Sequence, residues 1–195
     1  MNRDVRQVRT FSPNFITRED SKNPRIEGHF AVFNKNYELF EGCTESIAPG
    51  AFSDELHSDV RALIDHDTRL VLGRTTADTL ELREDEYGLW GGIDINPNDS
   101  EAMNLYARVK RGDVSQCSIG FIILDQECID RGDGTYHWLI KKVQLFEVSC
   151  CTFPAYEDTS ISARKADIEE IEKRKAEMWR EKARKRLKEV REYGA

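Results

Sequence analysis

Short apolar segments alternate with polar or glycine-containing turns over about the first 160 residues of the chain. Alternating polarity is typical of half-buried strands, and short runs rich in Val, Ile and Phe are typical of buried ones. Between the segments, residues 84–88 and the glycine-rich stretch 130–134 have the composition of turns. The pattern predicts a β-rich block with strands at residues 5–11, 26–34, 60–64, 71–75, 79–83, 89–95, 114–124 and 138–148.

Two short helices are expected inside this block. One would follow the turn at residues 47–52 and end near His57. The other would begin at a cap chosen among Asn98, Asp99 and Ser100, whose side chains can accept hydrogen bonds from the first free backbone amides. It would end at Gly112, because glycine readily adopts the left-handed conformation that closes a helix.

Residues 163–193 have a different composition, without glycine or proline and dense in Glu, Lys and Arg. A narrow apolar stripe recurs at helical spacing, and pairs such as Glu170 with Arg174 would support an exposed helix. The stripe is interrupted at Lys175 and Lys182. Two interpretations remain open: a solvated helix packed by one edge on its own domain, and a docking segment for a partner. The stripe consists of Ile168, Ile171, Trp179, Ala183, Leu187 and Val190.

Composition removes several classes of function. The chain has 195 residues, 39% of them hydrophobic and 33% charged, and a net charge of −7. That charge argues against a nucleic-acid binder that relies on phosphate neutralisation. The chain has no long apolar run and no apolar signal core at its start, so neither a membrane span nor export is expected. Five cysteines without a C-x-x-C spacing are interpreted as reduced thiols.

A serine, a histidine and a carboxylate each lie in or beside a predicted strand. Ser118 lies in the strand at 114–124, His66 follows the strand at 60–64, and Glu147 lies in the strand at 138–148. A serine becomes a nucleophile when an imidazole accepts its proton and a carboxylate orients that imidazole. Side chains alternate along a strand, so Cys117 would face away from the side that Ser118 faces.

Other assignments compete with these three. His29, His57 and His137 are alternative bases, and Asp65 and Asp67 are alternative partners for His66. The same two aspartates with His66 form a candidate metal-hydrolase site, although adjacent residues on a strand do not converge on one ion. Backbone amides near Ser118, or in a turn at residues 73–74, are candidate donors to an oxyanion.

An ordered set of motifs carries a family resemblance. The motifs are GHFAVFN at 28–34, ESIAPGAF at 45–52, DVRALIDHD at 59–67, VLGRT at 71–75, RGDVS running into SIGF at 111–121, and EVS followed by TFPAY at 147–156. In this order they resemble the prohead (capsid maturation) protease family of tailed phages with HK97-type capsids. That family is similar in fold and chemistry to herpesvirus assembly proteases.

The resemblance implies an α+β fold, a small β-barrel surrounded by helices, in a domain of residues 1–160. Residues 161–195 would be a charged C-terminal helix that serves as a scaffold or docking segment. The implied activity is that of a serine endopeptidase, with Ser118 as nucleophile, His66 as base and Glu147 orienting the base. No metal or organic cofactor is implied.

The implied substrates are scaffold or N-terminal segments of the major capsid protein, and the enzyme itself. They would be cut inside the immature capsid, in the bacterial cytoplasm, with no nucleic acid or membrane as partner. Self-association follows by analogy with the herpesvirus proteases. The alternative is a non-enzymatic internal scaffold or assembly chaperone.

Overall fold

The structure is a computed structural model that describes residues 6–11, 15–18, 24–153 and 158–193, with side chains of the last segment described for 165–186. Its contacts divide the chain into two compact units, one formed by Asn2–Glu157 and the other containing Asp158–Ala195. The two predicted domains, with their boundary at residue 160, stay a prediction, because a division by contacts does not show which segment folds alone.

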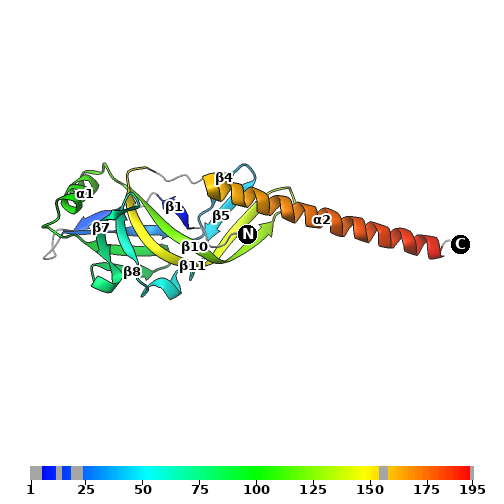
Figure 1. Cartoon of the computed structure of the whole chain (residues 1–195), viewed down its shortest axis with the longest axis horizontal. Helices are drawn as coiled ribbons and strands as arrows, with labels where there is room; N and C mark the ends of the chain where they lie inside the picture. The colour runs from blue at the N-terminus through cyan, green and yellow to red at the C-terminus, as the bar shows by residue number, and fades with distance from the viewer. Residues whose placement is uncertain (1–5, 12–14, 19–23, 154–157, 194–195) are drawn as a thin grey trace. The chain divides into compact units, whose positions relative to one another are not determined.

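The larger sheet is organised around the two longest strands of the described chain, β10 and β11 (Figure 1). Its order is β1-β10-β11-β5-β4, and β6 joins β11 further along the edge that β5 also uses, with β7 outside β6. Both β5 and β6 run parallel to β11, whereas β1 and β10 are antiparallel to their neighbours. The strands are β1 (Gln7–Phe11), β4 (Tyr37–Phe40), β5 (Cys43–Ile47), β6 (Arg61–Ile64), β7 (Asp67–Arg74), β10 (Gln116–Asp130) and β11 (Tyr136–Cys151).

A smaller antiparallel sheet shares its core with the larger one. Its order is β2-β3-β9-β8. Phe30 and Ile93 from this sheet and Ile119 and Val148 from the larger one are fully buried in the same apolar cluster. The Cys117 thiol reaches across to the carbonyl oxygens of β3. The strands are β2 (Ile16–Arg18), β3 (Arg25–Val32), β8 (Leu80–Glu84) and β9 (Gly88–Asp94).

The helical elements of residues 24–153 are short. In α1 (Ser100–Arg111) the Asp99 side chain accepts hydrogen bonds from the amides of Glu101 and Ala102, and Gly112 closes the helix with φ 89°. Both predicted ends are therefore confirmed, with Asp99 as the cap. The helix expected before His57 is a single 3-10 turn, η1 (Ser53–Glu55). A second turn of this kind, η2 (Thr75–Ala77), follows β7.

The predicted fold class is wrong. In the part of the chain that the structure describes, the strands form two open sheets rather than a closed barrel. A barrel needs every strand to be paired on both edges. Here β1 and β4 end the main path of the larger sheet, and β2 and β8 end the smaller one. Only α1 offers a buried helical face within residues 24–153, through Ala102, Leu105, Tyr106 and Val109, so helices do not surround the sheets either.

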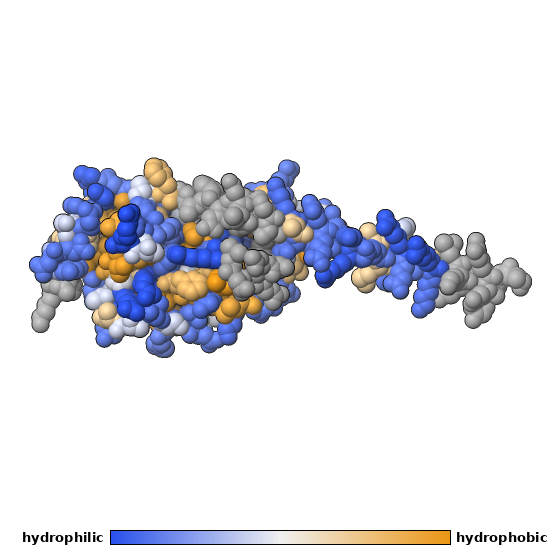
Figure 2. Space-filling view, viewed as in Figure 1, coloured by the Kyte–Doolittle hydropathy of each residue, from blue (hydrophilic) through white to orange (hydrophobic). Residues whose placement is uncertain are grey.

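The second unit is dominated by α2 (Asp158–Tyr193). Its described side chains are mostly hydrophilic (Figure 2), and the predicted pair of Glu170 with Arg174 is present. Met178 and Trp179 are 63% and 71% exposed. None of the described helices is long and apolar enough to cross a membrane.

Candidate active site

His66 lies at the tip of the hairpin that joins β6 to β7. Asp65 and His66 have φ of 47° and 61°, and they separate the paired residues Ile64 and Asp67. Two central residues with positive φ are the requirement of the tight hairpin turn that suits twisted strands. Asp65 fixes this turn, because its carboxylate accepts hydrogen bonds from the amide (2.7 Å) and the hydroxyl (3.1 Å) of Thr152.

Glu147 is the partner of the imidazole. Its Oε1 atom lies 2.6 Å from Nδ1 of His66, and its side chain is 3% exposed, compared with 20% for the histidine. The hydroxyl of Ser149 donates to Oε2 at 2.5 Å. The structure thus brings two of the three predicted residues together, from a turn and a strand that lie 81 residues apart in sequence.

The carboxylate of Glu147 is held in its ionised form. Burial raises the pKa, but the hydrogen bond and charge of His66 and the hydroxyl of Ser149 lower it. Arg6 also lowers it, with Nη2 lying 2.5 Å from the same Oε1 atom. The net effect is a pKa below the ordinary value. Because an ionised carboxylate only accepts hydrogen bonds, Nδ1 of His66 must carry the proton, and Nε2 is left as the basic nitrogen.

Ser118 faces the same side of the sheet as this pair. It lies opposite Ser149 in the β10–β11 ladder, and residues directly opposite in an antiparallel pair share a face. The imidazole contacts Glu147 through Nδ1, and its Nε2 lies 3.8 Å from the Cys151 thiol. The imidazole ring therefore lies above Ser149, between the side chains of Glu147 and Cys151. The predicted nucleophile lies across the ladder from that position.

The hydroxyl of Ser118 does not contact His66 in this structure. Ser118 is completely buried, and its Oγ donates to the carbonyl oxygen of Arg9 in β1 at 2.9 Å. Among the polar contacts of the described residues, none joins Ser118 to His66. The site therefore contains a formed histidine–carboxylate pair and a nucleophile that is engaged elsewhere.

Cys117 faces away from this site, as strand alternation predicts. Its thiol donates to the carbonyl oxygens of His29 and Phe30 at 3.3 and 3.4 Å, on the core side. Burial, together with the neighbouring Cys150 and Cys151, raises its pKa well above the ordinary value. A thiol in this environment is a poor nucleophile.

The alternative aspartates have other partners. Asp65 binds Thr152, and Asp67 binds the exposed Arg69. Residues 65 and 66 form a turn rather than an extended segment. His66 binds Glu147, so the three residues of the metal alternative point to separate partners.

The competing histidines are also occupied or remote. His29 pairs with Asp85 at 2.8 Å, and His57 is an exposed residue. His137 lies between the hydroxyls of Thr44 (2.8 Å) and Ser46 (2.9 Å), so it does contact a serine. Burial and then the charge of Arg131 lower its pKa, although Glu45 opposes them. Neither ring nitrogen of His137 is bonded to a carboxylate, unlike Nδ1 of His66.

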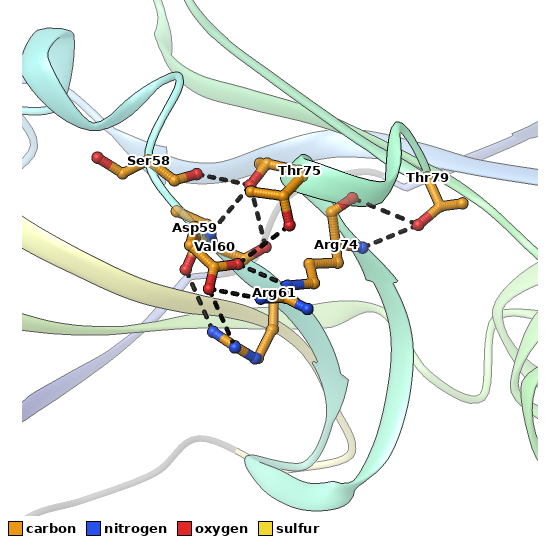
Figure 3. Close-up of polar contacts among 8 residues, drawn as sticks. Ser58, Asp59, Val60, Arg61, Arg74, Thr75 and Thr79 are labelled. Atoms are coloured by element: carbon orange, nitrogen blue, oxygen red, sulfur yellow. Dashed lines mark hydrogen bonds and ion pairs between the residues drawn. The ribbon is translucent and has the colours of Figure 1, made fainter.

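A polar network holds the base of the histidine hairpin (Figure 3). The Asp59 carboxylate accepts hydrogen bonds from Nε and Nη2 of Arg74 at 2.6 and 2.7 Å, and also from Arg61. These bonds connect the start of β6 to the end of β7. The hydrogen bond from Arg74 is the main cause that lowers the pKa of Asp59 to about 2. Thr75 adds a hydroxyl bond to the carbonyl of Ser58 at 2.6 Å.

The expected oxyanion turn at residues 73–74 is absent, because both residues belong to β7. The amide of Arg74 already donates to the Thr79 hydroxyl at 2.9 Å. Ser149 and Arg6 are contacts of Glu147 that sequence reasoning missed. Ser149 lies two residues after Glu147, so strand alternation could have found it.

The chain is similar in sequence to prohead proteases of tailed phages. A model of the caudovirus prohead serine protease family matches residues 13–174. The prohead protease of Enterobacteria phage HK97 is 33% identical over 167 residues, which cover 82% of this chain and 68% of that protein. The prohead protease of Escherichia phage T5 is 30% identical over 104 residues, which cover 53% of this chain and 45% of that protein.

The fold has a relative of known structure. The bacteriophage T4 capsid assembly protease superposes with a TM-score of 0.50 at 11% identity, covering 76% of this chain and 98% of that one, a likeness of fold alone. The sequence matches place the chain in the class of phage proteases. It belongs to the caudovirus prohead serine protease family, as the ordered motifs predicted.

Proposed function

We propose that this chain is a serine endopeptidase that cuts scaffold or N-terminal segments of the major capsid protein inside the immature capsid, and that it also cuts itself. The catalytic residues would be Ser118, His66 and Glu147. One observation carries the assignment: the imidazole of His66, bonded through Nδ1 to a buried carboxylate, lies on the face of the sheet where Ser118 stands. Family membership supports the proteolytic activity.

The proposed mechanism uses protein groups at each step. Ser118 Oγ attacks the carbonyl carbon of the scissile bond, while Nε2 of His66 accepts the hydroxyl proton. The charged imidazole is stabilised by Glu147. His66 then gives the proton to the leaving amine, which leaves an acyl group on Ser118. Water, deprotonated by His66, attacks this ester, and the proton returns to Ser118 as the acid product departs.

The assignment is tested by replacing the nucleophile. Co-expression of the major capsid protein with a Ser118→Ala chain should leave the capsid protein unprocessed, because the acyl intermediate cannot form. The rate of processing should fall at least about 10³-fold. Intact-mass spectrometry of the capsid protein measures the loss and also locates the cut made by the wild-type chain.

Two control variants sharpen this test. Ser115→Ala removes an exposed hydroxyl three residues earlier, and Ser46→Ala removes the hydroxyl that contacts His137. Both should retain processing. Unimpaired processing by Ser118→Ala would reject the nucleophile. If even the wild-type chain leaves the capsid protein intact, the result would favour the alternative function of a non-enzymatic internal scaffold.

A further inference from the structure

A buried amide oxygen near the proposed catalytic residues has no role in holding the fold. Gln116 is half-buried, and its Oε1 atom is fully covered without a hydrogen-bond partner among the described residues. Burying such an acceptor unpaired costs free energy, so an acceptor of this kind in a folded protein calls for a functional explanation. The position of Gln116 indicates which group it would bind.

Gln116 lies on the face of the sheet that carries the proposed catalytic residues. It is the first residue of β10 and lies directly opposite Cys151 in the β10–β11 ladder, where opposite residues share a face. Ser118 shares this face as well, because side chains alternate along a strand. The pairing of β10 with β1 covers Cys117–Phe121, so Gln116 lies just beyond it.

The basic nitrogen of His66 is found at the same end of the ladder. Its Nε2 atom lies 3.8 Å from the Cys151 thiol, beside the residue directly opposite Gln116. Facing Cβ atoms in an antiparallel pair are about 4.5–5.5 Å apart. A single water that donates to two acceptors joins atoms that are also about 4.5–5.5 Å apart. Nε2 and the amide oxygen are both acceptors, so one water can donate a hydrogen bond to each.

The Cys151 thiol is the other polar group close to Nε2, and it does not replace such a water. Burial raises the pKa of this thiol to about 12, with a further contribution from the charges of Asp65 and Glu147. The thiol therefore keeps its proton at neutral pH and is a weak nucleophile. Sulfur is also a weak hydrogen-bond acceptor, whereas the oxygen of Gln116 is a strong one.

We propose that Gln116 orients the water that hydrolyses the acyl-enzyme, an inference that rests on the proposed function. One O–H of the water donates to Nε2 of His66 and the other to the amide oxygen, which directs a lone pair at the ester carbon. The water oxygen bonds to that carbon while Nε2 takes one proton. The bond from the carbon to Ser118 Oγ then breaks, Oγ receives the proton from His66, and the acid product leaves.

The test separates the formation of the acyl-enzyme from its hydrolysis. With p-nitrophenyl acetate, the initial burst of p-nitrophenolate gives the acylation rate, and intact-mass spectrometry follows the loss of the acetyl group from the chain. Gln116→Ala should lengthen the lifetime of the acyl-enzyme at least about tenfold and leave the acylation rate within about twofold. For purified capsid protein, kcat/KM should also stay within about twofold, because this ratio contains no step after acylation.

Two further variants serve as controls. Gln116→Glu keeps an acceptor oxygen in the same place and should restore a lifetime within about threefold of the wild-type value. Gln126→Ala removes a glutamine farther along the same strand, opposite Ile140, and should behave like the wild-type chain. Circular dichroism checks that each variant is folded.

The outcomes distinguish this inference from the proposed function. Equal lifetimes for the wild-type and Gln116→Ala chains, or a loss of kcat/KM as large as the gain in lifetime, would overturn the role of Gln116 while leaving the protease intact. If the ester does not acylate the wild-type chain, the same comparison is made on the ester formed with the capsid fragment and trapped by acid. A wild-type chain that neither cleaves capsid protein nor forms an acyl-enzyme would reject the proposed function, and this inference with it.

Discussion

At the scale of single residues, the acidic partner of His66 is the assignment that the structure supports most directly. An unpaired carboxylate on an apolar strand between Phe146 and Val148 would be costly, and the structure supplies its partner at 2.6 Å. The same reasoning could not foresee Arg6, because nothing in its spacing relates it to a residue 141 positions away. Long-range contacts of charged side chains follow from topology rather than from local pattern.

Replacing Glu147 by glutamine tests its role as the group that orients the imidazole. The amide keeps the shape of the side chain but loses the charge that stabilises protonated His66. We expect kcat to fall between about 10²- and 10⁴-fold while the chain stays folded. Progress curves for capsid-protein cleavage measure the first effect, and circular dichroism the second. Unchanged kcat would assign the role to another carboxylate or to water.

The same variant changes the response to acid. The folded-state pKa of Glu147 is lowered, so its stabilising contribution is present above the ordinary value of 4.5 and is lost as the pH falls through the lower folded value. The wild-type chain should lose stability over that window, and Glu147→Gln should lose less. Urea unfolding at a series of pH values from 3 to 7, on the order of one unit apart, compares the two slopes.

At the scale of elements, the strands and caps that carry local signals were predicted, whereas the turn that holds His66 was not. Asp99 and Gly112 bound α1 as expected, and Gly132 and Gly134 adopt positive φ in the predicted hairpin. The turn at residues 65–66 contains no glycine, and the tolerance of Asp and His for positive φ is too weak a signal to predict it. Its conformation depends on the hydrogen bonds that the Asp65 carboxylate accepts from Thr152, a contact between segments distant in sequence.

Asp65→Ala tests whether this turn positions the base. The variant loses two hydrogen bonds and places alanine at a positive φ, so the free energy of unfolding should fall by about 1–2 kcal/mol. If the turn positions the His66 imidazole, kcat/KM should fall about tenfold. This loss should exceed the decrease that the smaller fraction of folded protein would cause. Asp65→Asn should restore both, because asparagine tolerates this φ and can accept from the Thr152 amide.

The control for this prediction lies two residues along the chain. Asp67→Ala removes a carboxylate that binds the exposed Arg69 and should leave kcat/KM within about twofold. Thermal unfolding gives the stability of each variant, and cleavage assays are run well below each midpoint. A loss in Asp65→Ala that merely tracks stability would show that the turn has no positioning role.

At the scale of the whole molecule, the resemblance predicted the family correctly and the architecture wrongly. The ordered motifs overlap β3, β5, the β6–β7 hairpin, β10 and β11, and the last three of these carry the site residues. They contain no information on whether those strands close into a barrel. Closure requires the outermost strands of a sheet to pair with each other. Here β5 and β6 both pair with the same edge of β11, and β4, β7 and β8 are outermost strands.

The charged helix α2 gives the last prediction, which concerns recruitment into the capsid. Its described side chains are mostly hydrophilic and largely exposed (Figure 2), and Met178 and Trp179, adjacent in sequence, are large hydrophobic residues exposed to 63% and 71%. Exposed aromatic residues of this kind commonly anchor protein interfaces. If α2 is the docking segment, removing residues 164–195 should reduce incorporation into immature capsids at least about tenfold, and the double variant Met178→Ser, Trp179→Ser should reduce it in part.

Quantitative mass spectrometry of purified immature capsids measures incorporation against the major capsid protein. The matched control is Glu177→Gln with Arg180→Gln, which changes neighbouring exposed residues of α2 without altering its net charge or Met178 and Trp179. Cleavage of isolated capsid protein by each purified chain separates docking from catalysis. A docking role requires that the truncated chain still cut free capsid protein while failing to enter the shell. Incorporation of that chain at the wild-type level would instead assign α2 to another role.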